Sequence, residues 1–126
     1  MSLTKVTSDV LEARYTNAAV INSTSGTISV DWSAAAVYKM NASLTGATTL
    51  NFTGFVKGQV LTIHQLEGAQ TVTLTSDAAN SSTFYKIGAD YDGSSDPNIL
   101  QIECLDDSDD ALFAFTTSTI TPSTTI

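Results

Sequence analysis

The sequence has 126 residues, of which 42% are hydrophobic, and its 13 acidic and 5 basic side chains give a net charge of −8. This length suits one domain with its own core, and the hydrophobic content excludes wholesale disorder. An acidic chain with scattered basic residues binds phosphate backbones and anionic membrane surfaces poorly, so we expect neither nucleic acid nor a membrane as a partner. The first residues also lack the apolar segment of a secretory signal.

The chain divides into three zones, and the first covers residues 1–19. Thr7 or Ser8 can cap a short helix whose first turn carries acidic residues, which suit the positive end of a helix dipole. The apolar face of that helix is narrow, so the helix needs a surface to lie on. We expect either a helix packed on the domain's own sheet or an arm that engages a partner.

The second zone, residues 20–117, alternates apolar and hydroxyl-bearing residues between frequent turn signals, which is typical of an all-β domain. The number of strands predicts an antiparallel β-sandwich with a jelly-roll-like arrangement. The segments with the clearest alternation are 28–32, 36–40, 48–52, 59–65, 70–76, 83–87, 98–105 and 111–117.

Three of these segments predict specific positions in the sandwich. Segments 59–65 and 70–76 flank the turn residues Glu67 and Gly68, so we expect them to form a hairpin. Segment 111–117 has apolar residues on both faces, which indicates the middle of a sheet or a subunit interface.

Two single residues are expected in the core. Cys104 is in phase with its apolar neighbours Leu100 and Ile102, so we interpret it as a buried structural thiol. Trp32 continues the apolar face of segment 28–32 and is expected to be buried as well. A sugar-binding surface would instead need exposed rings. The candidate rings for such a surface are Trp32, Tyr38, Tyr85 and Tyr91.

The third zone, residues 118–126, is rich in Thr and Ser and cannot form a core of its own. One interpretation is a flexible tail. The alternative is an extended arm that joins a neighbouring subunit as an added strand, because segments of high β-propensity and low charge pair readily at sheet edges. No internal repeat is convincing.

Two acidic clusters raise the question of a metal ion. Asp90, Asp92 and Asp96 lack the ligand spacing of an EF-hand, and such residues form turns without any metal. The run Asp106–Asp110 lies between two predicted strands and is typical of a solvated hairpin tip. A cation shared at a symmetry axis would also relieve the repulsion among these carboxylates. We predict turns at both clusters, with a cation site as the alternative.

The chain carries little of the usual equipment of catalysis. His64 is its one imidazole and Cys104 its one thiol, so neither a zinc site nor a conventional catalytic triad can be assembled. Most of the carboxylates lie in predicted turns, where nothing raises the pKa of one of them as glycoside hydrolysis requires. We therefore predict that the protein is not an enzyme, and we assign no catalytic residue, cofactor or metal ligand.

Several runs of the sequence can be compared with known families. They are Ile28-Ser29-Val30-Asp31-Trp32-Ser33, Leu44-Thr45-Gly46-Ala47-Thr48-Thr49-Leu50-Asn51-Phe52, Lys57-Gly58-Gln59, Leu61-Thr62-Ile63-His64-Gln65 and Thr71-Val72-Thr73-Leu74, together with the opening run Ser8-Asp9-Val10-Leu11-Glu12-Ala13-Arg14-Tyr15-Thr16. These runs resemble a segment of the virion proteins of tailed bacteriophages, found in head-decoration (cement) proteins and in tail-fibre or spike modules. The resemblance implies a viral structural role, a β-sandwich or jelly-roll body and trimeric assembly, but it assigns no functional residues.

Among the virion roles, a single domain without repeats or coiled-coil heptads favours a decoration protein over a fibre. A decoration protein on the capsid surface stabilises contacts between subunits of the major capsid protein. We expect the arm around Leu11, Arg14 and Tyr15, or the tail, to make the capsid contacts of a homotrimer. The alternatives are a tail-fibre or spike module and a carbohydrate-binding adhesion module.

Overall fold

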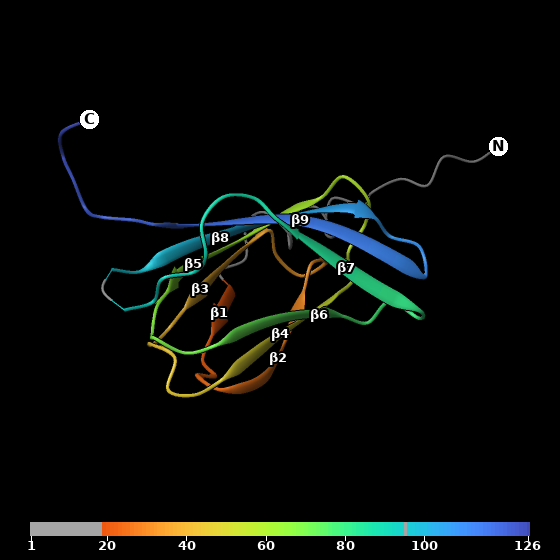
Figure 1. Cartoon of the computed structure of the whole chain (residues 1–126), viewed down its shortest axis with the longest axis horizontal. Coiled ribbons are helices and arrows are strands. Elements are labelled where there is room, and N and C mark those ends of the chain that lie inside the picture. Colours follow the sequence, from red (N-terminus) through yellow and green to blue (C-terminus); the bar gives the residue numbers. More distant parts are fainter. Residues whose placement is uncertain (1–18, 95) are drawn as a thin grey trace.

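The computed structural model describes residues 19–94 and 96–126 (Figure 1). Within these residues the regular structure consists of β-strands, and no helix occurs among them. The strands are β1 (Ala19–Ile21), β2 (Gly26–Asp31), β3 (Val37–Met40), β4 (Thr48–Thr53), β5 (Val60–Leu66), β6 (Val72–Ser76), β7 (Ser81–Lys86), β8 (Asn98–Asp106) and β9 (Asp110–Thr119).

The strands form two layers of unequal size. A six-stranded sheet has the order β1-β3-β5-β8-β9-β7, and a three-stranded sheet has the order β2-β4-β6. The two sheets lie face to face, with the smaller sheet below the larger one in Figure 1. The prediction of an all-β, sandwich-like domain is therefore confirmed.

Between residues 19 and 76 the chain winds in coils. Successive strands alternate between the two sheets, so that β1, β3 and β5 pair in parallel in one sheet and β2, β4 and β6 pair in parallel in the other. This is the arrangement of a short two-sheet β-solenoid. Gly26 pairs with Thr48 and Thr48 with Val72, so the coils differ in length. Unequal coils explain why the sequence shows no repeat of fixed period.

The predicted antiparallel, jelly-roll-like arrangement is wrong in strand direction, because five of the seven strand pairings are parallel. The predicted hairpin of segments 59–65 and 70–76 is also wrong. These segments form β5 and β6, which lie in different sheets. The turn at Gly68 carries the chain across the sandwich. A short crossing of this kind uses the same turn-forming residues as a hairpin, so the local sequence does not distinguish the two.

Strands β7, β8 and β9 complete the larger sheet. β8 pairs antiparallel with both β5 and β9, and β7 pairs in parallel with β9. Segment 111–117 therefore lies inside the sheet, as its apolar faces indicate. The acidic run Asp106–Asp110 forms the turn between β8 and β9, where the Ser108 N–H donates to the Asp106 carboxylate at 2.8 Å. The turn predicted there is confirmed.

The core lies between the sheets and is dominated by an aromatic cluster. The ring of Phe113 stacks on Phe84 with centroids 4.7 Å apart, and it contacts the edge of Phe55 at 4.9 Å. Trp32 is fully buried and lies 5.9 Å from both Phe52 and Phe113. The burial predicted for Trp32 is confirmed.

Cys104 points into the same core from β8 and is almost completely buried. Burial is the main cause that raises the pKa of its thiol to about 11, with the Asp107 carboxylate adding to the effect. Since the thiolate is the reactive form, Cys104 is an unreactive structural thiol, as predicted.

The ends of the chain differ from their predicted boundaries. β1 begins at Ala19 and β9 extends to Thr119, so the sandwich includes residues assigned to the neighbouring zones. Residues 120–126 form no strand and lead away from the body (Figure 1). The predicted N-terminal helix, together with Leu11, Arg14 and Tyr15, lies outside the described residues.

Candidate functional site: a cavity beside the edge of the smaller sheet

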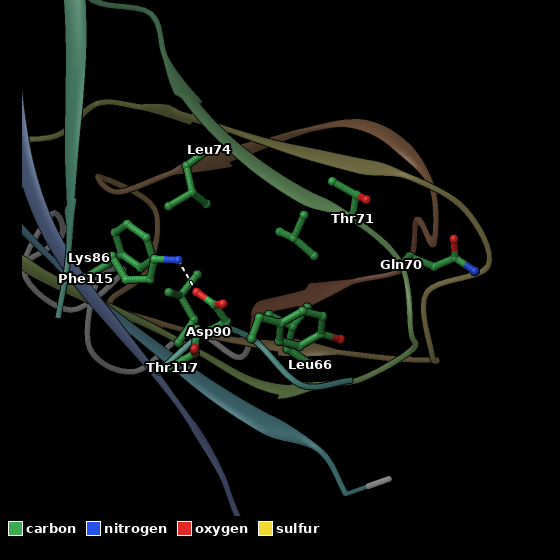
Figure 2. Close-up of a pocket in the computed structure, with 11 residues that line it drawn as sticks. Leu66, Gln70, Thr71, Leu74, Lys86, Asp90, Phe115 and Thr117 are labelled. Carbon is green, nitrogen blue, oxygen red and sulfur yellow. Dashed lines mark hydrogen bonds and ion pairs between the residues drawn. The ribbon is translucent and has the colours of Figure 1, made fainter. Parts of the chain in front are cut away.

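A cavity of about 500 Å³ opens between β6 and the six-stranded sheet (Figure 2). Its origin is the unequal size of the layers, because three strands cannot cover the inner face of six. β6 is the last strand of the smaller sheet, and the larger sheet continues past it. The lining residues are Leu66, Gln70, Thr71, Val72, Leu74, Lys86, Asp90, Tyr91, Leu100, Phe115 and Thr117.

The walls of the cavity are largely apolar. Leu66, Leu100 and Phe115 come from three strands of the larger sheet, and Val72 and Leu74 come from β6. All of these side chains contact the main core from its periphery or belong to it. The cavity is therefore a part of the core that the smaller sheet leaves uncovered.

The charged residues of the lining are Lys86 and Asp90, which pair with each other at the rim (Figure 2). The hydrogen bond from the Lys86 ammonium holds the pKa of the Asp90 carboxyl below its ordinary value. Both side chains are exposed, so the pair contributes little to stability. The pair also leaves the rim without net charge. Apolar contact is therefore the main interaction by which the cavity could bind another group.

Tyr91 fixes the loop that borders the cavity. Its hydroxyl donates to the Gly68 carbonyl at 2.8 Å, and the Gly68 N–H in turn donates to the Gly93 carbonyl at 3.0 Å. Burial is the largest cause that raises the pKa of Tyr91 to about 12, and the nearby carboxylates of Glu67 and Asp92 act in the same direction.

Replacing Tyr91 with Phe is expected to lower the free energy of unfolding by about 1 kcal/mol at neutral pH, because the Gly68 carbonyl loses its donor. Tyr91 has a raised pKa in the folded protein, so its contribution is present below pH 10 and is lost as the pH rises toward 12. The variant should therefore show a shallower decline over that interval in urea unfolding followed at several pH values. Tyr85→Phe, at a residue that is 52% exposed, is the matched control, and equal declines in both variants would contradict the assignment.

The acidic cluster before β8 forms turns. The Ser94 N–H and hydroxyl both donate to the Asp92 carboxylate, at 3.0 and 2.6 Å. The Asp96 carboxylate accepts a hydrogen bond from the Thr121 hydroxyl at 3.3 Å. Among the described residues, no three His, Cys, Asp or Glu side chains are placed to hold a metal ion together. The hydrogen bonds between Ser94 and Asp92 are those of a turn, as predicted for this part of the cluster.

The rings proposed for sugar binding do not form an exposed platform. Trp32 is fully buried, and Tyr91 is half-buried in the wall of the cavity. Tyr38 is half-buried too, and its hydroxyl donates to the Asp31 carbonyl at 2.7 Å. Tyr85 alone of the four is largely exposed. His64 lies half-buried on the outward face of β5.

Comparisons of the chain with protein-family models, with curated proteins and with solved structures found no match. Within the part of the chain that the structure describes, no helix is long and apolar enough to cross a membrane. The fold and the cavity thus define the molecule as a two-layer all-β domain built on a short solenoid.

The alternation in the sequence predicts that the apolar lining residues lie in strands, but it does not indicate a cavity. Leu74 and Leu100 carry the alternation of ordinary core residues. Whether such a residue is covered depends on which strand lies opposite it, and that follows from the crossings between the sheets. The sequence gives one signal of the charged rim, because Lys86 and Asp90 carry opposite charges and are only four residues apart.

Proposed function

We propose that this protein is a virion structural protein of a tailed bacteriophage that decorates the outer surface of the head. The observation that supports this proposal is an uncharged part of the outward face of the three-stranded sheet, which we call the hydroxyl face. It is bordered by Asp31, which pairs with Thr53 in the next row. Its residues form two rows across the parallel strands. The first row is Thr27, Thr49 and Thr73, and the second is Ser29, Asn51 and Thr75.

The hydroxyl face is unusual for a chain with a net charge of −8. It is held in register by the backbone ladder and by a hydrogen bond from the Thr75 hydroxyl to the side-chain amide oxygen (Oδ1) of Asn51 at 2.9 Å. The centres of protein interfaces are depleted of charged residues, since burying an unpaired charge is costly. A rigid, uncharged polar face therefore suits docking onto another protein.

As a cement protein, the domain would bind across the seam between neighbouring subunits of the major capsid protein. Binding to the assembled shell and not to free subunits stabilises the shell by mass action. The choice of the capsid as the partner rests on the resemblance of residues 28–74 to phage virion proteins. The hydroxyl face is the surface that we propose contacts it.

The test is occupancy of phage heads that lack this protein, assembled from the major capsid protein of its own phage. We expect the full chain to co-sediment with the heads and to raise their resistance to heat. Thr49→Glu or Thr73→Glu should lower the affinity by about tenfold or more, because each puts a charge into the contact. Thr83→Glu makes the same change on an exposed residue of β7 and should have no effect. Failure of the full chain to bind heads would reject the decoration role.

The arm is tested separately by replacing Leu11, Arg14 and Tyr15 together with Ala, which keeps the chain length. We expect lower occupancy on heads if these residues contact the capsid. Unchanged occupancy would assign the contact to the body of the domain alone.

A tail-fibre or spike module is the second candidate. It is favoured by the parallel edges that β2 and β6 present at the two ends of the smaller sheet, since an elongated assembly can grow along such edges. Binding to purified tails but not to heads would favour this role.

A further inference from the structure

We propose that the edge of β6 binds the tail of a second copy of this chain, residues 120–126, as an added parallel strand that covers the cavity. The inference rests on the fold and the tail, and it holds whether or not the protein binds a capsid.

The first observation is the open edge of β6. The Thr48 N–H donates to the Thr71 carbonyl at 2.9 Å, so the odd-numbered residues along β6 bond to β4. In a parallel ladder each residue directs its N–H and its carbonyl to the same side. Val72 and Leu74 therefore direct theirs to the open side of the strand. β6 is the outermost strand of its sheet within the described residues.

The second observation is that the cavity lies directly beneath this edge. The side chains of Val72 and Leu74 line it from β6, and those of Leu100 and Phe115 line it from the larger sheet. One added strand would pair with the open backbone groups and would place alternate side chains over the uncovered apolar wall. Peptides that join sheet edges gain affinity from the backbone and specificity from such pockets.

The open part of the edge is short. At its far end the Ser76 hydroxyl is hydrogen-bonded to the Ser82 hydroxyl of β7, so β7 closes the edge there. An added strand would thus enter beside Thr71 and extend to Leu74. A segment as short as the tail is long enough to fill this length.

The third observation is the pattern of the tail. In an extended segment, alternate residues share a face. One face of the tail carries Ile120, Pro122, Thr124 and Ile126, and the other carries Thr121, Ser123 and Thr125. This is the alternation of a half-buried strand.

The tail nevertheless finds little cover in the described part of its own chain. Ile120 is half-buried, Ile126 is fully exposed, and the tail leads away from the body (Figure 1). Residues 111–126 also contain no charged side chain, although the chain carries −8 overall. Two copies of such an acidic protein repel each other, and an uncharged segment is the part that can approach another copy without that repulsion.

Pro122 fixes the direction of the added strand. In the smaller sheet, the outward-facing residues of each strand bond to the strand before it, as those of β6 bond to β4. A parallel tail with its apolar face inward would therefore bond to β6 through Thr121, Ser123 and Thr125. Pro122, which has no N–H, would lie on the far edge, where none is needed. An antiparallel tail would turn Pro122 toward β6 and lose a hydrogen bond.

The association is tested by the mass of the full chain in solution, measured by sedimentation equilibrium. We expect an oligomer for the full chain and a monomer after deletion of residues 121–126. Thr125→Pro removes an N–H directed at β6 and should weaken association by about tenfold. Thr124→Pro removes an N–H on the far edge and should change it by less than about twofold. A monomeric full chain, or an opposite order of the two proline variants, would overturn the proposal.

The location is tested by a disulfide between copies. Chains with Thr73→Cys are mixed with chains carrying Ser123→Cys, and the native Cys104 does not compete because it is buried. We expect a covalent dimer on a non-reducing gel. Thr27→Cys, on the outward face of the opposite edge strand, is the matched control and should not cross-link. Equal cross-linking through Thr27, or no disulfide between the Thr73→Cys and Ser123→Cys chains, would overturn the assignment to β6 of a second copy.

Discussion

Phe113→Ala is expected to lower the free energy of unfolding by about 3–5 kcal/mol, the usual range for removing a fully buried aromatic ring. Phe113 has no exposed surface, and its ring contacts those of Trp32, Phe55 and Phe84. These rings come from both layers, so a cavity at Phe113 would loosen the contact between the sheets. Urea unfolding followed by tryptophan fluorescence measures the change, because Trp32 lies within the cluster.

Two variants control this result. Tyr85→Ala removes an aromatic ring of similar size that is 52% exposed, and it should cost less than about 1 kcal/mol. Phe113→Leu keeps most of the buried volume and should fall between the two. A loss at Phe113 no greater than at Tyr85 would show that the sheets are not held together through this cluster.

Gly68→Ala is expected to lower the free energy of unfolding by about 3 kcal/mol. Gly68 has a φ of +109°, which L side chains rarely adopt, and such strain costs about 1–3 kcal/mol. An added Cβ would lie 2.6 Å from the Leu44 carbonyl oxygen, so the backbone of two crossing loops would have to separate. The same loops carry the hydrogen bonds from Tyr91 and to Gly93.

Gly58→Ala separates the two effects. Gly58 also has a positive φ, of +88°, but nothing lies within 4 Å of the position of a Cβ there. We expect a loss of about 1–2 kcal/mol from backbone strain alone. Equal losses at the two glycines in chemical unfolding would show that the close approach of Gly68 to Leu44 does not matter to stability.

The sequence predicts the faces of the strands well and their partners poorly. Leu50 and Phe52 point inward and Thr49 and Asn51 outward, as the alternation indicates, because burial acts on each strand separately. Pairing depends on where each turn sends the chain. The turn after β5 crosses to the other sheet, although Glu67 and Gly68 equally suit a hairpin.

The cavity could not be predicted from the sequence for the same reason, because it depends on how the strands pair. Leu74, Leu100 and Phe115 are far apart in the sequence, and they meet because β6 ends the smaller sheet while β9 and β7 extend the larger one. No local pattern states how many strands each layer has. The tail is a different case, since its alternation is visible in the sequence but the surface that would complement it is not.

The position of β5 has a consequence for how the domain unfolds. β5 closes the solenoid on one side through β3, and it also holds the antiparallel β8 on the other. Neither half can open without exposing a strand whose Leu61 and Ile63 are fully buried. The parallel solenoid and the antiparallel β8–β9 pair thus share one strand, which is hydrogen-bonded on both of its edges. This makes β5 a cooperative junction, and the domain should unfold in a single transition despite its mixed construction.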